Sequence, residues 1–508
     1  MSPSPQRCTR QFALRSLLGA GLLAISISSL AVPPAGASSG AELASRIDAQ
    51  IGQPRFAAAS WGIAVVSLDS GQTVYAHQAD RLLQPASTAK LFTAALALAT
   101  LGPEYRIPTR LLAGGHIVRG RLNGPLILYG MGDPTLGTSS SPDWAEQLAS
   151  QAEALGLKFV QGDLIADDSY FASPAFGNGW EAGDLQSWFA VPTSALSVQE
   201  NIAHLTINPT VAGRPARLVF TDDAAGSEID NKLLTSAART PNDVNLYRAP
   251  GTPLLHAFGN IAADSSPQHF RLAMNDPALV AGARLRLALK KHGIRITGKL
   301  RALHWPQQET VQLAHPVHLG EVQSPPLREI VQQGLKRSQN LYMQNLLLAV
   351  GAAQSISAPG FRSSENRALD TLHRLLLEIG MPPSGSLIEE GAGLSRRDLV
   401  MPNAMVRLLG YLAAQPYAQM VREALPTAGV DGTLIRRMRG TAAENNVQAK
   451  TGNMSQVHCL AGYVTTAAGE RLAFAIMLNN YQRPDGAPAA SSDVDAIAVL
   501  LASYRGHD

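Results

Sequence analysis

Three short motifs that lie far apart along the chain constrain its fold more than any other feature. They are Ser-Thr-Ala-Lys at residues 87–90, Ser-Gln-Asn at 338–340 and Lys-Thr-Gly at 450–452. Each motif supplies hydroxyl, amine or amide groups of the kind that a nucleophilic active site uses, although each is weak evidence on its own. Taken together and in this order, they predict a fold that brings three distant segments to one cleft.

The first motif pairs a nucleophile with a base. Ser87 and Lys90 are three positions apart where an Ala- and Leu-rich run, 89–101, predicts a buried helix. Residues three apart on a helix share a face, so the Lys90 amine can reach the Ser87 hydroxyl. A desolvated lysine can lose its proton whereas arginine cannot, and this chain has only eight lysines. The alternative is a helix-capping serine followed by a solvent-facing lysine.

The second motif lies between two helical stretches, 327–335 and 341–353, where a short turn can aim its side chains into a cleft. We expect Ser338 to relay a proton to the leaving group and Asn340 to hold a peptide amide beside the nucleophile. A helix cap is the alternative. Ser-Glu-Asn at 364–366 also fits the pattern, but a helix that starts there explains it, so we favour Ser338.

The third motif lies on a predicted strand that precedes a second strand at 455–466. Gly452 would let a substrate backbone approach the strand closely. Lys450 supplies positive charge, and with the Thr451 hydroxyl it can bind the C-terminal carboxylate of a substrate. Exposed strand residues without such a role are the alternative, and the order of the three motifs argues against it.

Strand-like and helical segments divide the chain into four parts. Residues 1–37 form a leader, 38–105 and 302–508 form one unit, and 106–301 form an insertion. Strand-like segments at both ends of the unit flank a helical middle, which predicts an α+β domain. The insertion has many short strand-like runs and turns, so we expect a β-rich accessory region there.

The leader predicts export. Arginines precede an apolar run at 17–32, and Ala-Gly-Ala follows at 35–37, as in a signal peptide that is cleaved after Ala37. An uncleaved anchor is the alternative, although the run is short for a bilayer span. We therefore expect a periplasmic or otherwise extracytoplasmic protein without a membrane anchor after cleavage. Only Cys459 remains in the mature chain, so no intramolecular disulfide can form.

The composition and the motifs of the chain argue against several other classes of protein. The formal charge is +3 and the basic residues are scattered, which argues against a nucleic-acid partner. The sequence offers no histidine cluster for a metal and no Gly-x-Ser-x-Gly elbow of a Ser-His-Asp hydrolase. We expect neither a metal nor a cofactor.

In these three motifs and their order, the chain resembles the D-alanyl-D-alanine carboxypeptidase/endopeptidase family of low-molecular-mass class C penicillin-binding proteins. Stretches at 132–136, 324–327, 429–434 and 460–463 are similar to that family as well. The resemblance implies a transpeptidase-type, β-lactamase-like α/β sandwich that is interrupted by two accessory β-rich domains. It also implies a substrate, the peptidoglycan stem peptides that end in D-Ala-D-Ala.

The resemblance further implies an acyl-enzyme. Ser87 would attack the carbonyl of the penultimate D-alanine, or of a D-Ala to diaminopimelate cross-link, and water would release the product. β-Lactams would acylate the same serine. By analogy, the backbone N–H groups of Ser87 and Asn453 form an oxyanion hole, and Asp167 resembles an acidic position of the insertion that faces the cleft.

Three departures from the family pattern bear on rate and substrate preference. Gln339 stands where Asp or Asn is common, Met343-Gln344 replaces a small and an acidic residue, and Glu-Gly-Ala-Gly-Leu-Ser at 390–395 replaces Asp-Gly-Ser-Gly-Leu-Ser. Ala392 therefore lacks a hydroxyl. The alternative functions are a catalytically weak peptidoglycan-binding or sensor protein and a secreted β-lactamase, and the large insertion argues against the latter.

Overall fold

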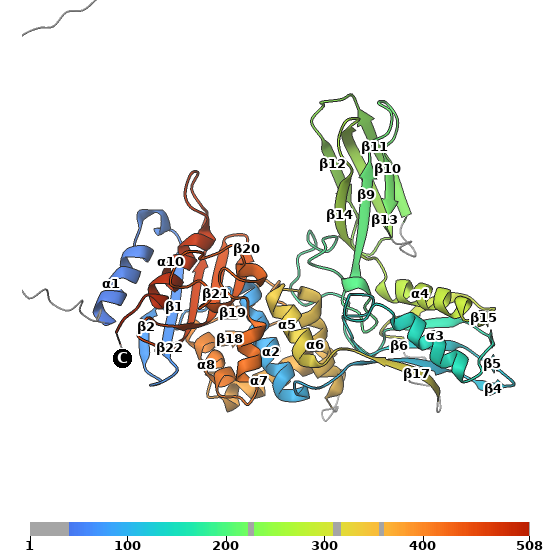
Figure 1. Ribbon diagram of the computed structural model, residues 1–508, viewed down its shortest axis with the longest axis horizontal. Coiled ribbons are helices and arrows are strands. Elements are labelled where there is room, and N and C mark those ends of the chain that lie inside the picture. Colours follow the sequence, from blue (N-terminus) through green and yellow to red (C-terminus); the bar gives the residue numbers. More distant parts are fainter. Residues whose placement is uncertain (1–39, 222–227, 308–315, 355–359, 507–508) are drawn as a thin grey trace, which may run out of the picture. The chain divides into compact units, whose positions relative to one another are not determined.

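The computed structural model describes residues 40–506, with the exception of 222–227, 308–315 and 355–359 (Figure 1). The expected signal peptide at 1–37 lies outside the described residues. The described chain consists of a unit that contains both ends of the chain and an insertion between helices α2 (Lys90–Leu101) and α5 (Leu327–Lys336) of that unit.

A five-stranded antiparallel sheet joins the two ends of the chain. Its order is β2-β1-β22-β21-β20, and β1 pairs with β22 over its whole length, from Ser60 opposite Asn479 to Ser67 opposite Leu472. This pairing brings the N- and C-terminal segments into one sheet. The strands are β1 (Ser60–Ser67), β2 (Thr73–His77), β20 (Gln448–Met454), β21 (Val457–Thr465) and β22 (Arg471–Asn479).

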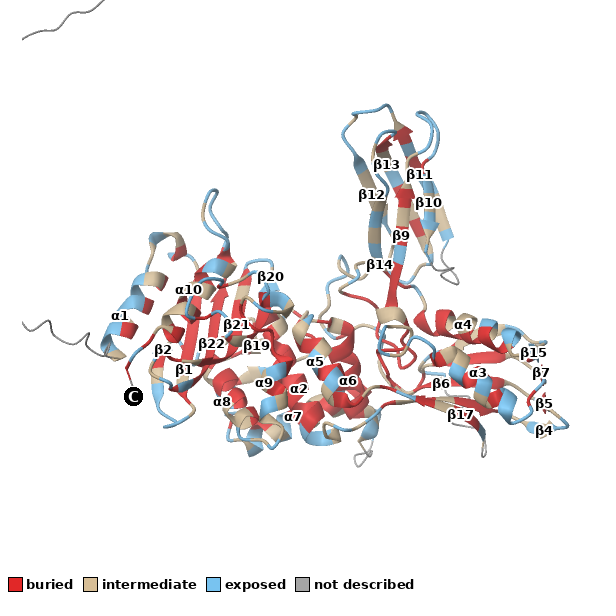
Figure 2. Cartoon of the chain, in the orientation of Figure 1, coloured by how far each residue is buried: buried red, intermediate tan, exposed pale blue. Residues whose placement is uncertain are grey.

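Helices cover both faces of this sheet, whose strands are largely buried (Figure 2). Along β22, Ala473 and Ala475 belong to one core, while Leu472, Phe474 and Ile476 belong to the other, as expected for side chains that alternate along a strand. The unit is therefore an α/β sandwich. Its helices are α1 (Gly40–Ile51) and α10 (Ala490–Ala502) on one face, and α2 (Lys90–Leu101), α5 (Leu327–Lys336), α6 (Asn340–Ala353), α7 (Ser364–Glu378), α8 (Pro402–Ala413) and α9 (Ala418–Ala424) with the other core.

Helix α2 is enclosed by other helices, and its composition follows from this position. Every residue from Lys90 to Leu98 is buried, and α2 packs against α5, α6, α7 and α8. A helix that is apolar on all sides is stable only inside a protein. The predicted helix at 89–101 is confirmed, and the short 3₁₀ turn η2 (Ala86–Ala89) precedes it and carries Ser87.

The larger part of the insertion has a core between two sheets and two helices. The sheet orders are β16-β8-β6-β3-β17 and β15-β7-β5-β4. Because β17 pairs with β3, we propose that the insertion ends near residue 323 rather than at 301. The elements are β3 (Pro108–Ala113), β4 (His116–Val118), β5 (Arg121–Asn123), β6 (Leu126–Gly130), α3 (Trp144–Ala154), β7 (Phe159–Gln161), β8 (Leu164–Asp167), α4 (Pro277–Lys291), β15 (Arg295–Ile296), β16 (Leu300–Leu303) and β17 (Val317–Gln323).

The smaller part of the insertion consists of strands. Two three-stranded sheets, ordered β10-β9-β14 and β11-β13-β12, enclose a small core of their own. In the first half of β13 the buried Leu255 and Ala257 alternate with half-buried or exposed residues, which is typical of a sheet with one face in solvent. The strands are β9 (Ile202–Asn208), β10 (Arg217–Phe220), β11 (Glu228–Ser236), β12 (Asp243–Tyr247), β13 (Leu254–Ala262) and β14 (Gln268–Ala273).

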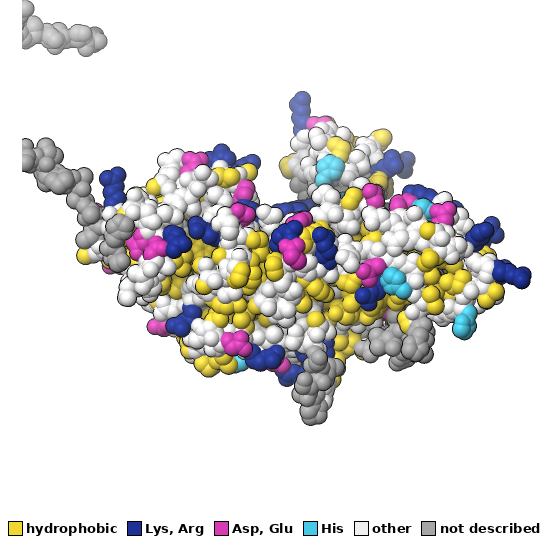
Figure 3. Space-filling view, turned by 60° about the horizontal axis from the view of Figure 1, so that its bottom comes forward, with side chains coloured by type: hydrophobic (Ala, Val, Ile, Leu, Met, Phe, Trp, Pro, Cys, Tyr) yellow, Lys and Arg dark blue, Asp and Glu magenta, His cyan; other side chains and the backbone are white. Residues whose placement is uncertain are grey.

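The described surface has a mixed charge. Basic and acidic side chains are interspersed on the face drawn in Figure 3, in keeping with the scattered basic residues of the sequence. Among the described residues, no helix has the length and apolar character that crossing a membrane requires.

Candidate active site

The three motifs meet beside the central sheet. η2, which carries Ser87, packs against the edge strand β20, which carries Lys450 to Gly452. The two elements are so close that a Cβ atom at Gly452 would lie 2.5 Å from the carbonyl oxygen of Pro85. Glycine is therefore required at this position by the approach of another segment of the chain itself.

Lys90 lies at the centre of the hydrogen-bond network. Its Nζ donates to Ser87 Oγ at 2.8 Å and to Asn340 Oδ1 at 2.6 Å, and it also donates to the carbonyl oxygen of Ala392. Asn340 Nδ2 donates to the carbonyl of Phe189 at 2.7 Å, which turns Oδ1 toward the amine. Asn340 Oδ1 and the Ala392 carbonyl oxygen can only accept hydrogen bonds, so a neutral amine donates its two hydrogens to them. Its lone pair then faces the Ser87 hydroxyl.

Burial makes Lys90 able to exchange its proton near neutral pH. The side chain is fully buried, and desolvation lowers the pKa of Lys90 from 10.5 to about 7. The carboxyl groups of Glu390 and Asp398 act in the opposite direction and limit the fall. A lysine of this kind satisfies the requirement for a general base at neutral pH.

Ser338 and Lys450 form a second pair. Lys450 is fully buried, and its Nζ donates to Ser338 Oγ at 2.8 Å and to the carbonyl oxygen of Thr451 at 2.7 Å. Desolvation lowers the pKa of Lys450 well below its usual value, and the charges of Lys90 and Arg437 lower it further. Since the lysine donates to the serine oxygen, the Ser338 hydroxyl proton is free for another acceptor.

The turn that carries Ser338 is held by the insertion. Ser338 has φ of +57°, a left-handed conformation that a residue with a side chain rarely adopts. On either side of it, Arg337 Nη1 donates to Glu200 Oε1 at 2.8 Å and Gln339 Nε2 donates to Glu200 Oε2 at 2.8 Å. The unusual Gln339 is therefore a donor to a carboxylate of the insertion.

The remaining residues of the third motif differ in exposure. Thr451 is buried, and its hydroxyl lies 2.8 Å from that of Thr433, in the 3₁₀ turn η4 (Gly432–Leu434). Asn453 is exposed, and its Oδ1 lies 3.1 Å from His458 Nδ1 on β21. The backbone of β20 thus runs from the buried Lys450 to the surface within three residues.

Asp167 lies elsewhere. It is the last residue of β8 in the insertion, fully buried, and its Oδ1 accepts from the backbone N–H of Ser169 at 2.8 Å. Its strand neighbours are Leu303 and Tyr129. The structure therefore places Asp167 in the sheet of the insertion and not in the network of Lys90.

The competing triplet at 364–366 has the structural role that the sequence predicts. α7 begins at Ser364, and the hydroxyl of the preceding Ser363 accepts from the N–H of Asn366 at 3.1 Å as an N-cap. Glu365 accepts from Gln344 Nε2 at 2.8 Å. The cap explains this triplet in full.

Three residues that contribute to the hydrogen bonds of the site do not belong to the sequence motifs. The carbonyl groups of Phe189 and Ala392 accept in the network, but backbone atoms leave no signature in a sequence. Glu200 lies in the 3₁₀ turn η3 (Gln199–Asn201) with φ of +56°, and only its contact with Arg337 and Gln339 identifies it.

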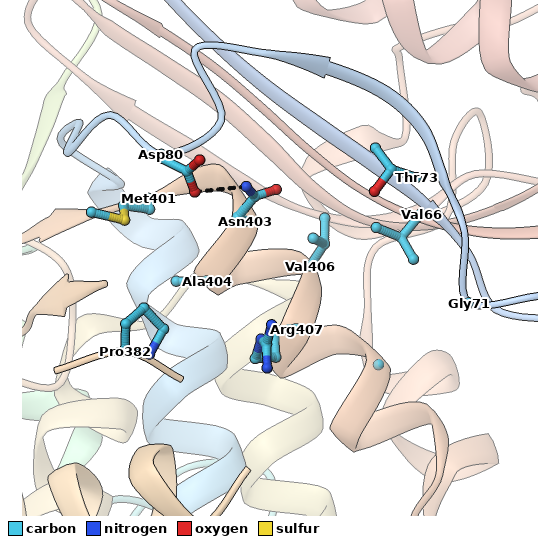
Figure 4. A pocket seen from close by; sticks show the side chains of 11 residues that line it. Val66, Gly71, Thr73, Asp80, Pro382, Met401, Asn403, Ala404, Val406 and Arg407 are labelled. Atoms are coloured by element: carbon cyan, nitrogen blue, oxygen red, sulfur yellow. Dashed lines mark hydrogen bonds between the residues drawn. The ribbon is translucent and has the colours of Figure 1, made fainter. Parts of the chain in front are cut away.

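A separate cavity lies beside β1, β2 and α8. It has a volume of about 480 Å³ and is lined by residues of β1, β2 and α8 and the loops near them, where Asn403 Nδ2 donates to Asp80 Oδ1 at 2.7 Å (Figure 4). None of the motif residues lines it. Within the described ranges, no group of three His, Cys, Asp or Glu residues could hold a metal ion.

Comparisons with known proteins identify the family of the chain. A model of the D-Ala-D-Ala carboxypeptidase 3 (S13) family matches residues 43–504. A D-alanyl-D-alanine carboxypeptidase of Actinomadura sp. (strain R39) is 34% identical over 481 residues, which cover 92% of this chain and 85% of that protein. The D-alanyl-D-alanine carboxypeptidase DacB of Haemophilus influenzae is 28% identical over 437 residues, or 84% of this chain and 86% of that protein.

A solved structure shares the fold. The crystal structure of penicillin binding protein 4 (dacB) from Haemophilus influenzae matches with a TM-score of 0.78 and 26% sequence identity, over 91% of this chain and 99% of that chain. The matches confirm the resemblance drawn from the motifs, and they confirm that the protein is a hydrolase with a penicillin-binding-protein fold. The chain belongs to the D-Ala-D-Ala carboxypeptidase 3 (S13) family.

Proposed function

We propose that this protein cleaves peptidoglycan stem peptides through an acyl-enzyme on Ser87. The observation that carries the proposal is the contact of a fully buried lysine amine with the Ser87 hydroxyl at 2.8 Å. A serine hydroxyl becomes a useful nucleophile when a positioned base takes its proton as it attacks. Lys90 fits this requirement, because its pKa of about 7 leaves a large neutral fraction near pH 7.

In the acylation step, Lys90 takes the Ser87 proton while Oγ bonds to the carbonyl carbon of the penultimate D-alanine. The backbone N–H groups of Ser87 and Asn453 would stabilise the oxyanion. The C–N bond then breaks, and the leaving amine takes the Ser338 hydroxyl proton, which Lys450 replaces through its 2.8 Å contact. Proton transfer to the amine is needed because an amide anion is a poor leaving group.

In the deacylation step, water replaces the amine. Acylation leaves Lys90 protonated and Lys450 neutral, so Lys90 gives its proton to solvent and Lys450 takes one from solvent before the ester is hydrolysed. Lys90 takes a proton from this water, the hydroxide attacks the ester carbonyl, and Ser87 leaves with the proton. The products are a shortened stem peptide and a free enzyme, which makes the reaction a hydrolysis.

We propose D-Ala-D-Ala stem-peptide ends as the substrate, with D-Ala to diaminopimelate cross-links as a second one. The carboxylate of the last D-alanine would bind the hydroxyl of Thr451 and the charge of Lys450. The names of the relatives from Actinomadura and Haemophilus influenzae support the carboxypeptidase reaction. Peptidoglycan lies outside the cytoplasmic membrane, so this substrate agrees with export by the leader and with an extracytoplasmic location.

We also propose that β-lactams acylate Ser87. A structure of the Haemophilus influenzae protein was solved as a complex with a β-lactam, which supports this reaction for the same fold. The β-lactam amide would take the place of the scissile peptide bond. Since the ring-opened amine stays attached to the acyl group, it can shield the ester from water and prolong the adduct.

The experiment is intact-mass spectrometry of the protein and of Ser87→Ala after benzylpenicillin, followed by incubation with muropeptides. The proposal expects one penicillin adduct, its loss in Ser87→Ala, and release of D-alanine or cleavage of cross-linked dimers. An adduct without cleavage would indicate a binding or sensor protein, and rapid turnover of penicillin would indicate a β-lactamase. An equal adduct in both proteins would refute Ser87 as the nucleophile.

A further inference from the structure

A loop behind Lys90, residues 390–395, is organised around one buried carboxylate. Glu390 is fully buried, and its carboxylate accepts from the backbone N–H groups of Ala392 and Leu394, both at 2.7 Å, and of Ser395 at 3.3 Å. Three donors on one carboxylate fix the path of the backbone around it. The family resemblance places an aspartate here, so the longer side chain is a departure from the usual pattern.

The 390–395 loop presents its carbonyl groups to α2. The Gly391 carbonyl accepts from Thr93 Oγ1 at 2.8 Å, and the Ala392 carbonyl accepts from Lys90 Nζ. A Cβ atom at Gly393, which has φ of +68°, would lie 2.1 Å from the backbone oxygen of Ala86 in η2. The loop is therefore packed against both elements that carry the nucleophile and its base, and Glu390 gives it the shape to do so.

Glu390 also dominates the charge around Lys90. Burial lowers the pKa of Lys90, and two negative charges raise it. The effect of Glu390 is the larger of the two, and that of Asp398 is the smaller. Burial first, and the Glu390 charge second, raise the pKa of Asp398 well above its usual value. Among the cations, the charges of Lys90 and Arg437 lower the pKa of Lys450.

Two more carboxyl groups face this pair. Glu389 precedes the loop, and its charge contributes to the raised pKa of Asp398. Burial raises the pKa of Glu365 on α7 to about 7. Glu365 accepts from Gln344, whose own oxygen accepts from the N–H of Gly391. Gln344 therefore ties the start of the loop to α6 and α7 without adding a charge beside Lys90.

We propose that Glu390 is a positioning residue for Lys90, because it holds the Ala392 carbonyl against the amine and supplies the negative charge that lets the amine take and keep the Ser87 proton. The inference rests on the proposed function, since it concerns the acylation of Ser87. A neutral amine places its two hydrogens on Asn340 and Ala392. If the Ala392 carbonyl moves away, nothing directs the lone pair to the nucleophile.

The test is the rate constant of acylation by a fluorescent penicillin, measured by stopped flow from about pH 5 to 9. We expect Glu390→Gln to slow acylation at high pH by about tenfold or more. We also expect the acid limb, the pH range over which the rate rises as Lys90 loses its proton, to move lower by about one pH unit, because the charge that favours the protonated amine is lost. Glu390→Asp keeps the charge. Its acid limb should stay in place while the shorter side chain slows acylation.

Glu470→Gln is the matched control, because Glu470 is a buried glutamate in the turn between β21 and β22. It should change neither the rate nor the acid limb.

An acid limb that stays in place in Glu390→Gln overturns the proposal, since a merely structural role would slow acylation without moving it. If Glu390→Gln does not fold, a wild-type rate in Glu390→Asp overturns it instead. A wild-type protein that forms no adduct on Ser87 would refute the proposed function itself, and this outcome is read from the wild type alone.

Discussion

Glu200 of the insertion accepts a 2.8 Å hydrogen bond from Gln339, which directly follows Ser338. Arg337 donates to the other oxygen of the same carboxylate. One residue of the insertion thus holds both neighbours of a serine whose φ is +57°. A strained conformation of this kind persists only where its surroundings hold it. The insertion therefore contributes to the geometry of the site.

We expect Glu200→Ala to slow penicillin acylation about tenfold, the effect of losing charge-assisted hydrogen bonds worth about 1.5 kcal/mol. The reason is that Ser338 is then free to leave its left-handed conformation and to lose its contact with Lys450. Stopped-flow acylation rates measure the effect. Glu153→Ala, which removes an exposed glutamate of the same insertion, is the control. Equal rates in the two variants would show that Ser338 does not depend on Glu200.

Acylation should become faster as the pH rises through about 7, the pKa of Lys90, because only the neutral amine can take the Ser87 proton. Lys90→Arg keeps a cation that never loses its proton, so we expect a loss of about a thousandfold or more at every pH. Lys158→Arg, on the surface of the insertion, should behave as the wild type. A wild-type acid limb in Lys90→Arg would assign the titration to another group.

The side chains of the site are readable in the sequence because their chemistry is tied to residue type. Only lysine can supply an amine, and the two lysines of the motifs are the two that the structure buries fully. The carbonyl groups of Phe189 and Ala392 have no such signature, since every residue has a carbonyl. They become visible only when the fold brings them to the amines.

The fold was predictable from residue type in some segments and not in others. β1 and β22 are apolar runs toward the two ends of the chain, so an α+β unit followed from their pattern, although their pairing did not. The last strand of the insertion did not, because β17 joins its sheet by pairing with β3, about two hundred positions earlier. Asp167 was carried over by resemblance, and no local pattern could show that its strand ends inside the sheet of the insertion.

Gly452→Ala should disable the site by steric pressure. The new Cβ atom would lie 2.5 Å from the Pro85 carbonyl oxygen, so β20 and η2 must move apart. We expect at least a tenfold slower acylation and a loss of about 1–3 kcal/mol in the free energy of unfolding, as for other overpacked positions. Chemical denaturation and acylation rates measure both effects.

Gly410→Ala is the control for this change. A Cβ atom at Gly410, within α8, meets nothing within 4 Å, and alanine favours a helix over glycine. The control should gain about 0.5–1 kcal/mol of stability and keep its acylation rate. A Gly452→Ala variant as active as this control would mean that η2 and β20 can separate without harm to the site.

Asn340→Asp should move the acid limb of acylation in the direction opposite to Glu390→Gln. A carboxylate at the position of Oδ1, which lies 2.6 Å from Lys90 Nζ, favours the protonated amine and raises the pKa of Lys90. The variant also loses the donor to the Phe189 carbonyl. We expect the acid limb about one pH unit higher and acylation about tenfold slower at neutral pH, because less of the base is neutral there.

Asn446→Asp, whose amide donates to the Thr465 carbonyl far from the motifs, should leave the limb in place. A limb that moves to lower pH in Asn340→Asp would contradict the assignment of Lys90 as the base that titrates.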